Sequence, residues 1–318
     1  MKRSYGKLLA LVLVGMGSSC SAVYEDLDPC QQNVGFVYDY NMSFADAFPS
    51  SPTDMNLYVF NQDSLFVTTY SGSAMELSNG MYGMPVSMPA GTYHLVAWGG
   101  NTDDLYETSP LTEGVSAMKD LTVRLRRQEN GQLQQAQGLD KLLQGVSSIN
   151  IDSTDHSQAT VHLMNNTKQL VFIIQTDDGN ALNPEDYHFS ITAQNGKMAF
   201  NNDMLEDFPV TYTEFVKSSM SQDGLDVLKA EINTLRLMAD QEARLQIFAN
   251  ESKGNILDID LIAYLKMFKS TYYSNMSDQE WLDRNTSFNI VFFMDPNTGM
   301  ITTLQIGPWK IVLVDHEL

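Results

Sequence analysis

The chain is dominated by short apolar or alternating runs that are separated by turn residues. Five such runs precede residue 100, and they are rich in valine, tyrosine, phenylalanine and leucine: residues 34–40, 55–60, 65–70, 84–88 and 93–98. Runs of this length and composition predict β-strands. Their regular spacing by turns is typical of an antiparallel β-sandwich.

The same pattern resumes after a polar passage over residues 127–158, which predicts a long loop with a short helical piece. Residues 159–164 and 169–175 predict a kinked strand that opens a second sandwich. The Asn195-Gly196 turn predicts a hairpin between its flanking runs. Further strands are predicted at residues 231–238, 244–249, 288–294, 301–306 and 309–314.

Two helical pieces interrupt the second series of strands. Residues 258–268 place apolar side chains on one helical face, and Ser277 with Glu280 predicts a capping box for a short helix. We therefore predict a mainly β protein with two tandem β-sandwich domains, over residues 33–156 and 157–318, and short helices in the second.

The N-terminus predicts export. A basic head precedes an apolar run over residues 8–16, which is too short to span a bilayer as a helix, and small residues lead to Cys20. Small residues ending in cysteine resemble a lipobox, which predicts a signal peptide over residues 1–19, a lipid on Cys20 and an acidic tether over residues 20–32. Ordinary secretion, with cleavage after Ala22, is the alternative.

Composition and charge limit the classes of partner that the chain can bind. The formal net charge is −20, so the chain repels phosphate backbones, and we expect no nucleic-acid partner. The 43% of hydrophobic residues allows a sizeable core. From Leu8 to Met118 the chain has no lysine or arginine, so an Arg/Lys-specific protease has no site there.

The sequence offers no motif for catalysis or metal binding. The five histidines are scattered, and there is no nucleophile elbow, phosphate-binding loop or dinucleotide-binding loop. We predict a protein that is not an enzyme and has no cofactor or metal. If Cys20 carries lipid, Cys30 is either a buried small residue or an unpaired thiol.

Several segments, taken in order, resemble one family. They are CSAVYEDLDPC at residues 20–30, VYDYNM at 37–42, ADAF at 45–48, LYVF at 57–60, GTYHLVAWGG at 91–100, QEWLDR at 279–284 and IGPW at 306–309. Together they resemble the FimB/Mfa-type fimbrial anchor lipoproteins of Bacteroidales type V fimbriae, over nearly the whole chain.

The resemblance implies two transthyretin-like sandwiches in a surface-exposed outer-membrane lipoprotein that anchors fimbriae and limits their length. It also implies that stalk subunits, the major pilins, lose an N-terminal strand to an Arg/Lys-specific protease and accept a neighbour's strand in the resulting groove. Because this chain lacks such a cleavage site, we expect it to keep its first strand. A tip or accessory subunit, or an adhesin for host protein or glycan, is the alternative, and a surface hydrolase is a third.

Two sets of residues follow as candidate sites. By analogy, the last predicted strand engages the first stalk subunit through Trp309, Ile311, Val312, Leu313 and Val314; the alternative is a final core strand. The acidic residues behind Cys20 resemble signals that send lipoproteins to the cell surface, with a flexible acidic tether as the other interpretation: Glu25, Asp26 and Asp28.

Overall fold

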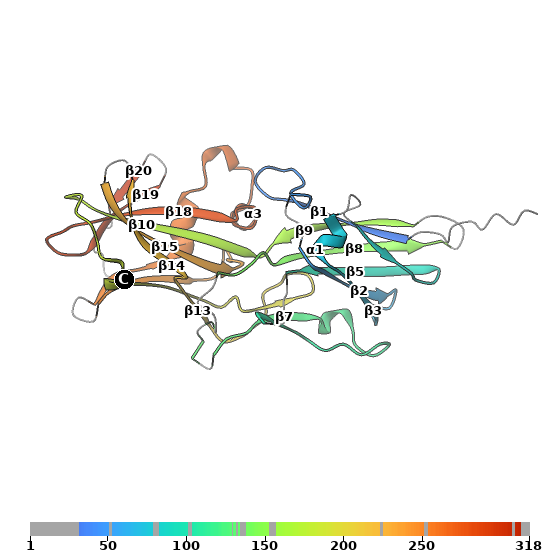
Figure 1. The fold of residues 1–318 in the computed structure, drawn as a ribbon. Helices are drawn as coiled ribbons and strands as arrows, with labels where there is room; N and C mark the ends of the chain where they lie inside the picture. The colour runs from blue at the N-terminus through green and yellow to red at the C-terminus, as the bar shows by residue number, and fades with distance from the viewer. Residues whose placement is uncertain are drawn as a thin grey trace, which may run out of the picture.

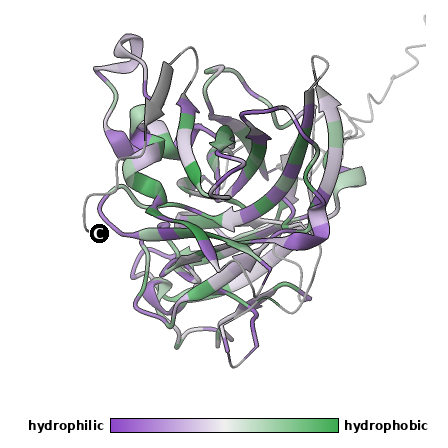
Figure 2. Ribbon diagram, turned by 90° about the vertical axis from the view of Figure 1, so that its left-hand side faces the viewer, coloured by the Kyte–Doolittle hydropathy of each residue, from purple (hydrophilic) through white to green (hydrophobic). Residues whose placement is uncertain are grey.

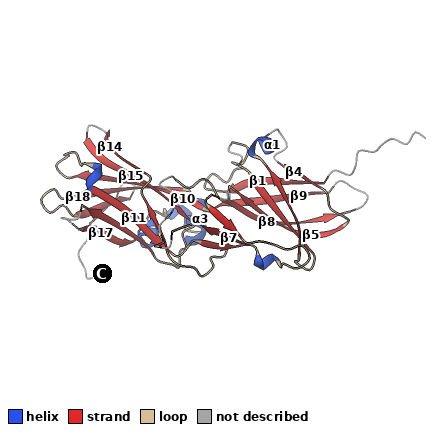
Figure 3. Ribbon diagram, turned by 60° about the horizontal axis from the view of Figure 1, so that its bottom comes forward, coloured by secondary structure: helices blue, strands red, loops and turns tan. Residues whose placement is uncertain are grey.

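The computed structural model describes residues 32–312 except 51–52, 79–82, 101–103, 129, 132, 134–137, 153–156, 223–224, 251–253 and 307–308. The chain is mainly β, as Figures 1 and 3 show, and that prediction is confirmed. The first half contains β1 (Gln32–Tyr40), β2 (Met55–Asn61), β3 (Phe66–Gly72), α1 (Ala74–Ser78), β4 (Gly83–Val86), β5 (Gly91–Gly99), β6 (Tyr106–Thr108), the 3-10 helix η1 (Met118–Asp120), β7 (Thr122–Leu125), β8 (Leu143–Ile151) and β9 (Gln158–Asn165).

The second half carries most of the helices, as predicted, although α1 in the first half was not expected. Its elements are β10 (Thr167–Thr176), η2 (Pro184–Asp186), β11 (Tyr187–Ala193), β12 (Lys197–Ala199), β13 (Val210–Thr213), β14 (Val216–Gln222), β15 (Leu225–Leu235), β16 (Ala243–Ala249), β17 (Asn255–Asp260), α2 (Leu261–Met267), η3 (Thr271–Tyr273), α3 (Asp278–Arg284), β18 (Ser287–Met294), β19 (Ile301–Ile306) and β20 (Trp309–Val312). Among the described residues, no helix is long and apolar enough to cross a membrane.

The first half is built on a seven-stranded sheet in the order β3-β2-β5-β8-β9-β1-β4. The Tyr70 hydroxyl of β3 donates to the Ser87 carbonyl just beyond β4, at 2.6 Å, so the two edges of this sheet lie close together. Alternate residues of its strands, such as Val34 and Phe36 on β1 and Leu57 and Val59 on β2, are buried in one core. In Figure 2, where the second half of the chain faces the viewer, apolar and polar segments likewise alternate along several strands.

The second half is a sandwich of two sheets. A six-stranded sheet runs β14-β15-β10-β18-β19-β20, and a four-stranded sheet runs β13-β11-β16-β17. Phe172 of the larger sheet stacks on Phe189 of the smaller, with ring centroids 5.9 Å apart, and on Phe292 at 6.1 Å. Aromatic contacts of this kind add to the area that the two sheets bury between them.

A small sheet, β12-β7-β6, connects the halves, because β12 of the second half pairs with β7 of the first. Its buried residues join a continuous core that includes Trp98 and Tyr106 from the first half and Leu170 from the second. The β5 strand faces both cores: Leu95 and Ala97 belong to the first, whereas Val96 and Trp98 belong to the shared one.

Two sequence predictions about strand pairing are wrong. The strand at residues 159–164 forms as β9, but it pairs with β1 and β8 in the first sheet instead of opening the second sandwich. The Asn165 side chain accepts hydrogen bonds from Thr167, and the chain passes to β10 there. The division of domains at residues 156 and 157 stays a prediction; we propose that the boundary lies at Asn166.

The second wrong prediction is the hairpin at Asn195-Gly196. The flanking strands form, but β11 pairs with β13 and β16, whereas β12 pairs with β7. Asn195 is buried, and its amide donates to the carbonyls of Leu235 and Arg236. The Asn-Gly pair therefore makes a buried crossover between two sheets, because its side chain satisfies backbone groups that would otherwise lack partners.

The predicted antiparallel arrangement holds for most strand pairs, but two pairs are parallel. The β1 strand pairs with β9 in parallel, and so does β10 with β18. Parallel neighbours need a long connection. Here residues 41–157 separate β1 from β9, and residues 177–286 separate β10 from β18. Two boundaries also differ: residues 143–151 form β8 inside the predicted loop, and residues 258–260 end β17 before α2 begins.

Candidate functional site

The predicted lipid site and export signal lie outside the described residues. These are Cys20, Glu25, Asp26 and Asp28, and the same is true of Leu313 and Val314 at the other end. Lipid attachment and surface export therefore stay predictions. Within the described part of the chain, no three histidine, cysteine or acidic side chains form a group that could hold a metal ion.

The predicted partner-binding strand forms an edge of the six-stranded sheet. Trp309, Ile311 and Val312 belong to β20, which pairs antiparallel with β19 from Ile306↔Trp309 to Thr303↔Val312. No second strand flanks β20 among the described residues. An edge of this kind presents backbone donors and acceptors on which another chain can add a strand.

The opposite edge of this sheet, β14, has a different character. Its sequence VKSSMSQ is polar, and Lys217 donates to the Tyr187 carbonyl at 2.8 Å. Lysine and polar residues on an edge strand disfavour pairing with other chains. The sequence of β20 and the residues that follow, WKIVLV, also contains one lysine, Lys310, but its other residues are apolar or β-branched, which favours strand addition.

The first described strand, β1, is paired on both sides. It lies between β9, from Asn33↔Gln158 onward, and β4, from Gln32↔Val86 to Gly35↔Gly83. Its inward side chains, Val34 and Phe36, are almost completely buried. Removing this strand would open the sheet and expose its core, so the strand is an integral part of the first half.

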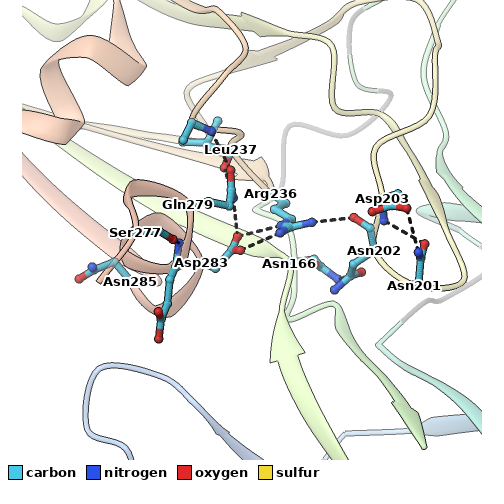
Figure 4. A network of polar contacts seen from close by, with 12 residues as sticks. Asn166, Asn201, Asn202, Asp203, Arg236, Leu237, Ser277, Gln279, Asp283 and Asn285 are labelled. Atoms are coloured by element: carbon cyan, nitrogen blue, oxygen red, sulfur yellow. Dashed lines mark hydrogen bonds and ion pairs between the residues drawn. The ribbon is translucent and has the colours of Figure 1, made fainter. Parts of the chain in front are cut away.

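Helix α3 forms the centre of a polar network at the junction of the two halves (Figure 4). Arg236 makes a two-pronged ion pair with Asp283, with distances of 2.8 and 2.7 Å, and donates to the Asn202 carbonyl at 2.6 Å. Gln279 donates to Asp283 at 2.9 Å and to the Leu237 carbonyl at 3.2 Å. Because the Asp283 side chain is only 3% exposed, this carboxylate needs its arginine partner.

The same helix fixes the end of β1. Arg284 forms an ion pair with Glu280 at 2.8 Å and donates to the carbonyls of Asp39 and Asn41 at 3.4 and 3.3 Å. The Asn41 amide in turn donates to the Tyr38 carbonyl at 2.8 Å. The YDYNM and QEWLDR segments, which lie far apart in the sequence, therefore meet at this junction.

The predicted capping box is half formed. The Ser277 hydroxyl accepts a hydrogen bond from the Glu280 amide at 3.0 Å, as an N-cap should. The Glu280 carboxylate instead accepts from Arg284. Ser277 is therefore confirmed as the N-cap residue. Its predicted partner, Glu280, instead holds Arg284, which contacts the first half.

A buried lysine completes the junction. Lys168 on β10 is fully buried, and its ammonium donates to the carbonyls of Asp283 and Asn285, at 2.8 Å each. Burial lowers the pKa of Lys168 from 10.5 to about 7, although the nearby Asp283 carboxylate opposes this shift. The lysine thus satisfies the last carbonyls of α3 and connects the helix to the central strand of the sheet.

The two glycines of the AWGG segment are required by close contacts. A Cβ atom on Gly99 would lie 2.2 Å from the Met55 sulfur. On Gly100, which has a φ of +74°, a Cβ atom would lie 1.9 Å from the Lys141 carbonyl oxygen. Only glycine fits both positions, so this segment of the resemblance has a structural explanation.

Comparison with known proteins decides the family. The family of fimbrillin-A associated anchor proteins Mfa1 and Mfa2 matches residues 27–315. The chain belongs to this family. No curated protein matches the chain.

Three solved structures are similar to this anchor-family protein. A candidate polysaccharide-binding protein from Bacteroides thetaiotaomicron is 31% identical, covers 90% of this chain and 99% of its own, and has a TM-score of 0.79. A candidate adhesin from the same organism is 30% identical with the same coverage and a TM-score of 0.78. The fimbrial anchor protein Mfa2 from Porphyromonas gingivalis, 18% identical over 89% of this chain and 98% of its own, shares the fold with a TM-score of 0.66.

Membership of the family gives this protein a fimbria-associated role, and the predicted resemblance is confirmed. The edge strand β20 is the one predicted site that the described residues include. Sequence reasoning missed the α3 junction as a site, although it noticed its QEWLDR segment. The apolar neighbours Trp281 and Leu282 indicate that this helix packs against the core, but no local signal marks Asp283 as a member of a buried ion pair.

Proposed function

We propose that this protein is a lipid-anchored, surface-exposed outer-membrane protein that holds fimbriae to the cell and limits their length. It caps the base of the stalk by β-strand exchange with a stalk subunit, the major pilin, and carries out no catalysis. The observation that carries the proposal is family membership over residues 27–315.

The N-terminal half supports an anchor over a stalk subunit. The chain has no lysine or arginine from Leu8 to Met118, so an Arg/Lys-specific protease cannot separate the lipid site from β1. The β1 strand is also paired on both sides, so among the described residues no place beside β1 is vacant for a neighbour's strand. Lipid on Cys20 and acidic export residues behind it would then stay with the folded body.

The C-terminal strand supports contact with the stalk. The β20 strand pairs with β19 alone among the described residues, and the buried Ile301 and Leu304 of β19 hold that strand in the core. If β20 leaves the sheet to enter a pilin, the sheet still ends on a packed strand. If β20 stays, its free edge can accept a strand from the pilin.

Two truncations test this role. Removal of residues 309–318 deletes β20 and the rest of the candidate contact, whereas removal of residues 315–318 leaves residues 309–314 in place and serves as the matched control. We expect both proteins to fold, as measured by circular dichroism and thermal unfolding, and only the longer truncation to abolish co-purification with the major pilin. Persistent pilin binding by a folded protein without β20 would show that this strand is not the contact.

An adhesin, at the tip or as an accessory subunit, is the second candidate. The similarity to proteins described as a candidate polysaccharide-binding protein and a candidate adhesin, at 31% and 30% identity, favours it. Immunogold labelling distinguishes the two positions: an anchor is labelled at the cell-proximal end of each fimbria, and a tip subunit at the distal end.

A further inference from the structure

A cavity of about 640 Å³ lies between the end of β7 and the segment that leads into β13. Its wall contains three arginines, Arg124, Arg126 and Arg127, whereas Glu107 is its only lining carboxylate among the described residues. In a chain with a net charge of −20, such a group of guanidinium groups stands apart. It follows the long N-terminal stretch that has almost no basic residues.

Two of these arginines share one carboxylate behind the wall. Arg124 donates to Asp207 through Nε and Nη2, at 3.0 and 3.1 Å, and Arg127 Nη2 lies 2.8 Å from the same side chain. Burial would raise the pKa of Asp207, but the hydrogen bonds from Arg127 and Arg124 outweigh it and hold the pKa below its usual value. Asp207 is therefore ionised, and its single negative charge balances only one of the two positive charges of this pair of arginines.

Arg127 is the arginine of this pair that has an unsatisfied hydrogen-bond donor. Its side chain is only 6% exposed, and its Nη1 has no hydrogen-bond partner among the described residues. Nη1 packs closely against Gly196, since a Cβ atom at that position would lie 2.6 Å from it. Both Nη atoms of Arg127 are buried, so this residue adds positive charge behind the wall, whereas the 39% exposed Arg124 presents its guanidinium to the cavity. A planar carboxylate matches the geometry of a guanidinium best.

The surroundings indicate a sugar rather than an apolar ligand. A second cavity of about 590 Å³ adjoins the first through Pro209, which lines both, and it carries the amide side chains of Gln194, Gln241 and Gln246. Phe208, next to Pro209, is 76% exposed and presents a flat apolar face. Amides suit hydroxyl groups, and an aromatic face suits the C–H side of a sugar ring.

We infer that these two cavities form a binding site for an acidic oligosaccharide, in which Arg124 takes the carboxylate of a uronic acid residue and the buried Arg127 behind it adds its positive charge. The neighbouring sugar passes over Phe208 and Pro209 toward the amide-lined cavity. This function is separate from the strand contact at β20, so an anchor or an adhesin could carry it.

Calorimetric titration of the full chain with oligogalacturonate tests the site. We expect binding that weakens with added salt, and at least tenfold weaker binding of a neutral galactose oligomer of the same length. Arg127→Gln and the more exposed Arg124→Gln should each weaken uronate binding about tenfold or more. Lys119→Gln, which removes an exposed charge outside the cavity, is the matched control and should leave the affinity unchanged.

Three results would overturn the assignment. One is equal binding of the acidic and neutral oligomers, and another is an equal loss with Lys119→Gln and with folded Arg124→Gln. The third is an oligoglutamate peptide that binds as tightly as the uronate and loses affinity with Arg124→Gln, which would make the ligand an acidic peptide. Because Arg124 is 39% exposed, its variant keeps the test valid even if Arg127→Gln does not fold.

Discussion

The guanidinium carbon of Arg284 lies 4.1 Å from the centre of the Tyr40 ring and 4.5 Å from that of Phe44. Arg284 ends helix α3 in the second half, whereas Tyr40 ends β1, the first described strand. The contact thus joins the strand that follows the predicted tether to the half that carries β20. In an anchor, a load on the fimbria would pass through this junction to the lipid.

Arg284→Ala should weaken this junction. It removes a cation–π contact and the hydrogen bonds to Asp39 and Asn41, and we expect a loss of about 2 kcal/mol in the free energy of unfolding. Chemical denaturation measures this loss. Arg244→Ala is the control, because Arg244 is 55% exposed in its pair with Asp258, and it should cost at most about 1 kcal/mol. Equal losses would mean that Arg284 has no special role.

Asp283→Asn should lower the free energy of unfolding more than Arg284→Ala does. It leaves Arg236 buried beside a neutral partner, and loss of one member of a buried pair costs about 3 kcal/mol. The double variant Arg236→Met/Asp283→Leu removes both charges, so we expect it to regain part of this loss. If the double variant is less stable than the single one, the ion pair stabilises the junction more than apolar packing can.

Lys168 should give the protein a pH-dependent stability. With a folded pKa of about 7 and an ordinary value of 10.5, the unfolded chain binds more protons between these pH values. Stability should therefore rise with pH in this window, by up to about 1.4 kcal/mol per pH unit, and show no such slope below pH 7.

The unfolding free energy of the wild type and of Lys168→Met is measured across that pH range, and the two slopes with pH are compared. Lys119→Met, at an exposed position, is the control and should show no difference in slope. A Lys168→Met variant that keeps the wild-type pH profile would contradict the lowered pKa.

A new protease site tests whether β1 is permanent. Ser50→Arg places a cleavable arginine in the exposed turn after β1. After cleavage by an Arg-specific protease under native conditions, we expect the fragment with β1 to stay bound, because β1 pairs with both β9 and β4. Size-exclusion chromatography followed by mass spectrometry detects it, with a heat-denatured sample as control. Release of the fragment would show the behaviour expected of a stalk subunit.

Local pattern predicted most strands of this fold but not their partners. Alternation on β1 and β2 was clear because one face of each is buried. The β8 strand was missed because Gln144, Ser147 and Ser148 interrupt its apolar residues, although it lies in the middle of a sheet. Sheet membership of β9 and the crossover at Asn195 depend on contacts with distant residues, which no local signal encodes.

The two candidate sites also differ in how far the sequence predicted them. The β20 strand was predicted because its residues are apolar on both faces, whereas the arginine-lined cavity arises only when β7 meets the Phe208–Thr211 segment. The closely spaced Arg124, Arg126 and Arg127 were the available signal, since they stand in a strongly acidic chain. Asp207, the carboxylate that Arg124 and Arg127 share, comes from far along the sequence and could not be assigned to them in advance.

The central claim is that the protein holds fimbriae to the cell through Cys20. Cys20→Ser in the producing bacterium, followed by fractionation and intact-mass analysis, tests it most directly. We predict that the wild type is lipidated and remains in the outer membrane, and that the variant and its attached fimbriae appear in the medium. A variant that stays in the membrane with its fimbriae, or a wild type without lipid, would contradict the account.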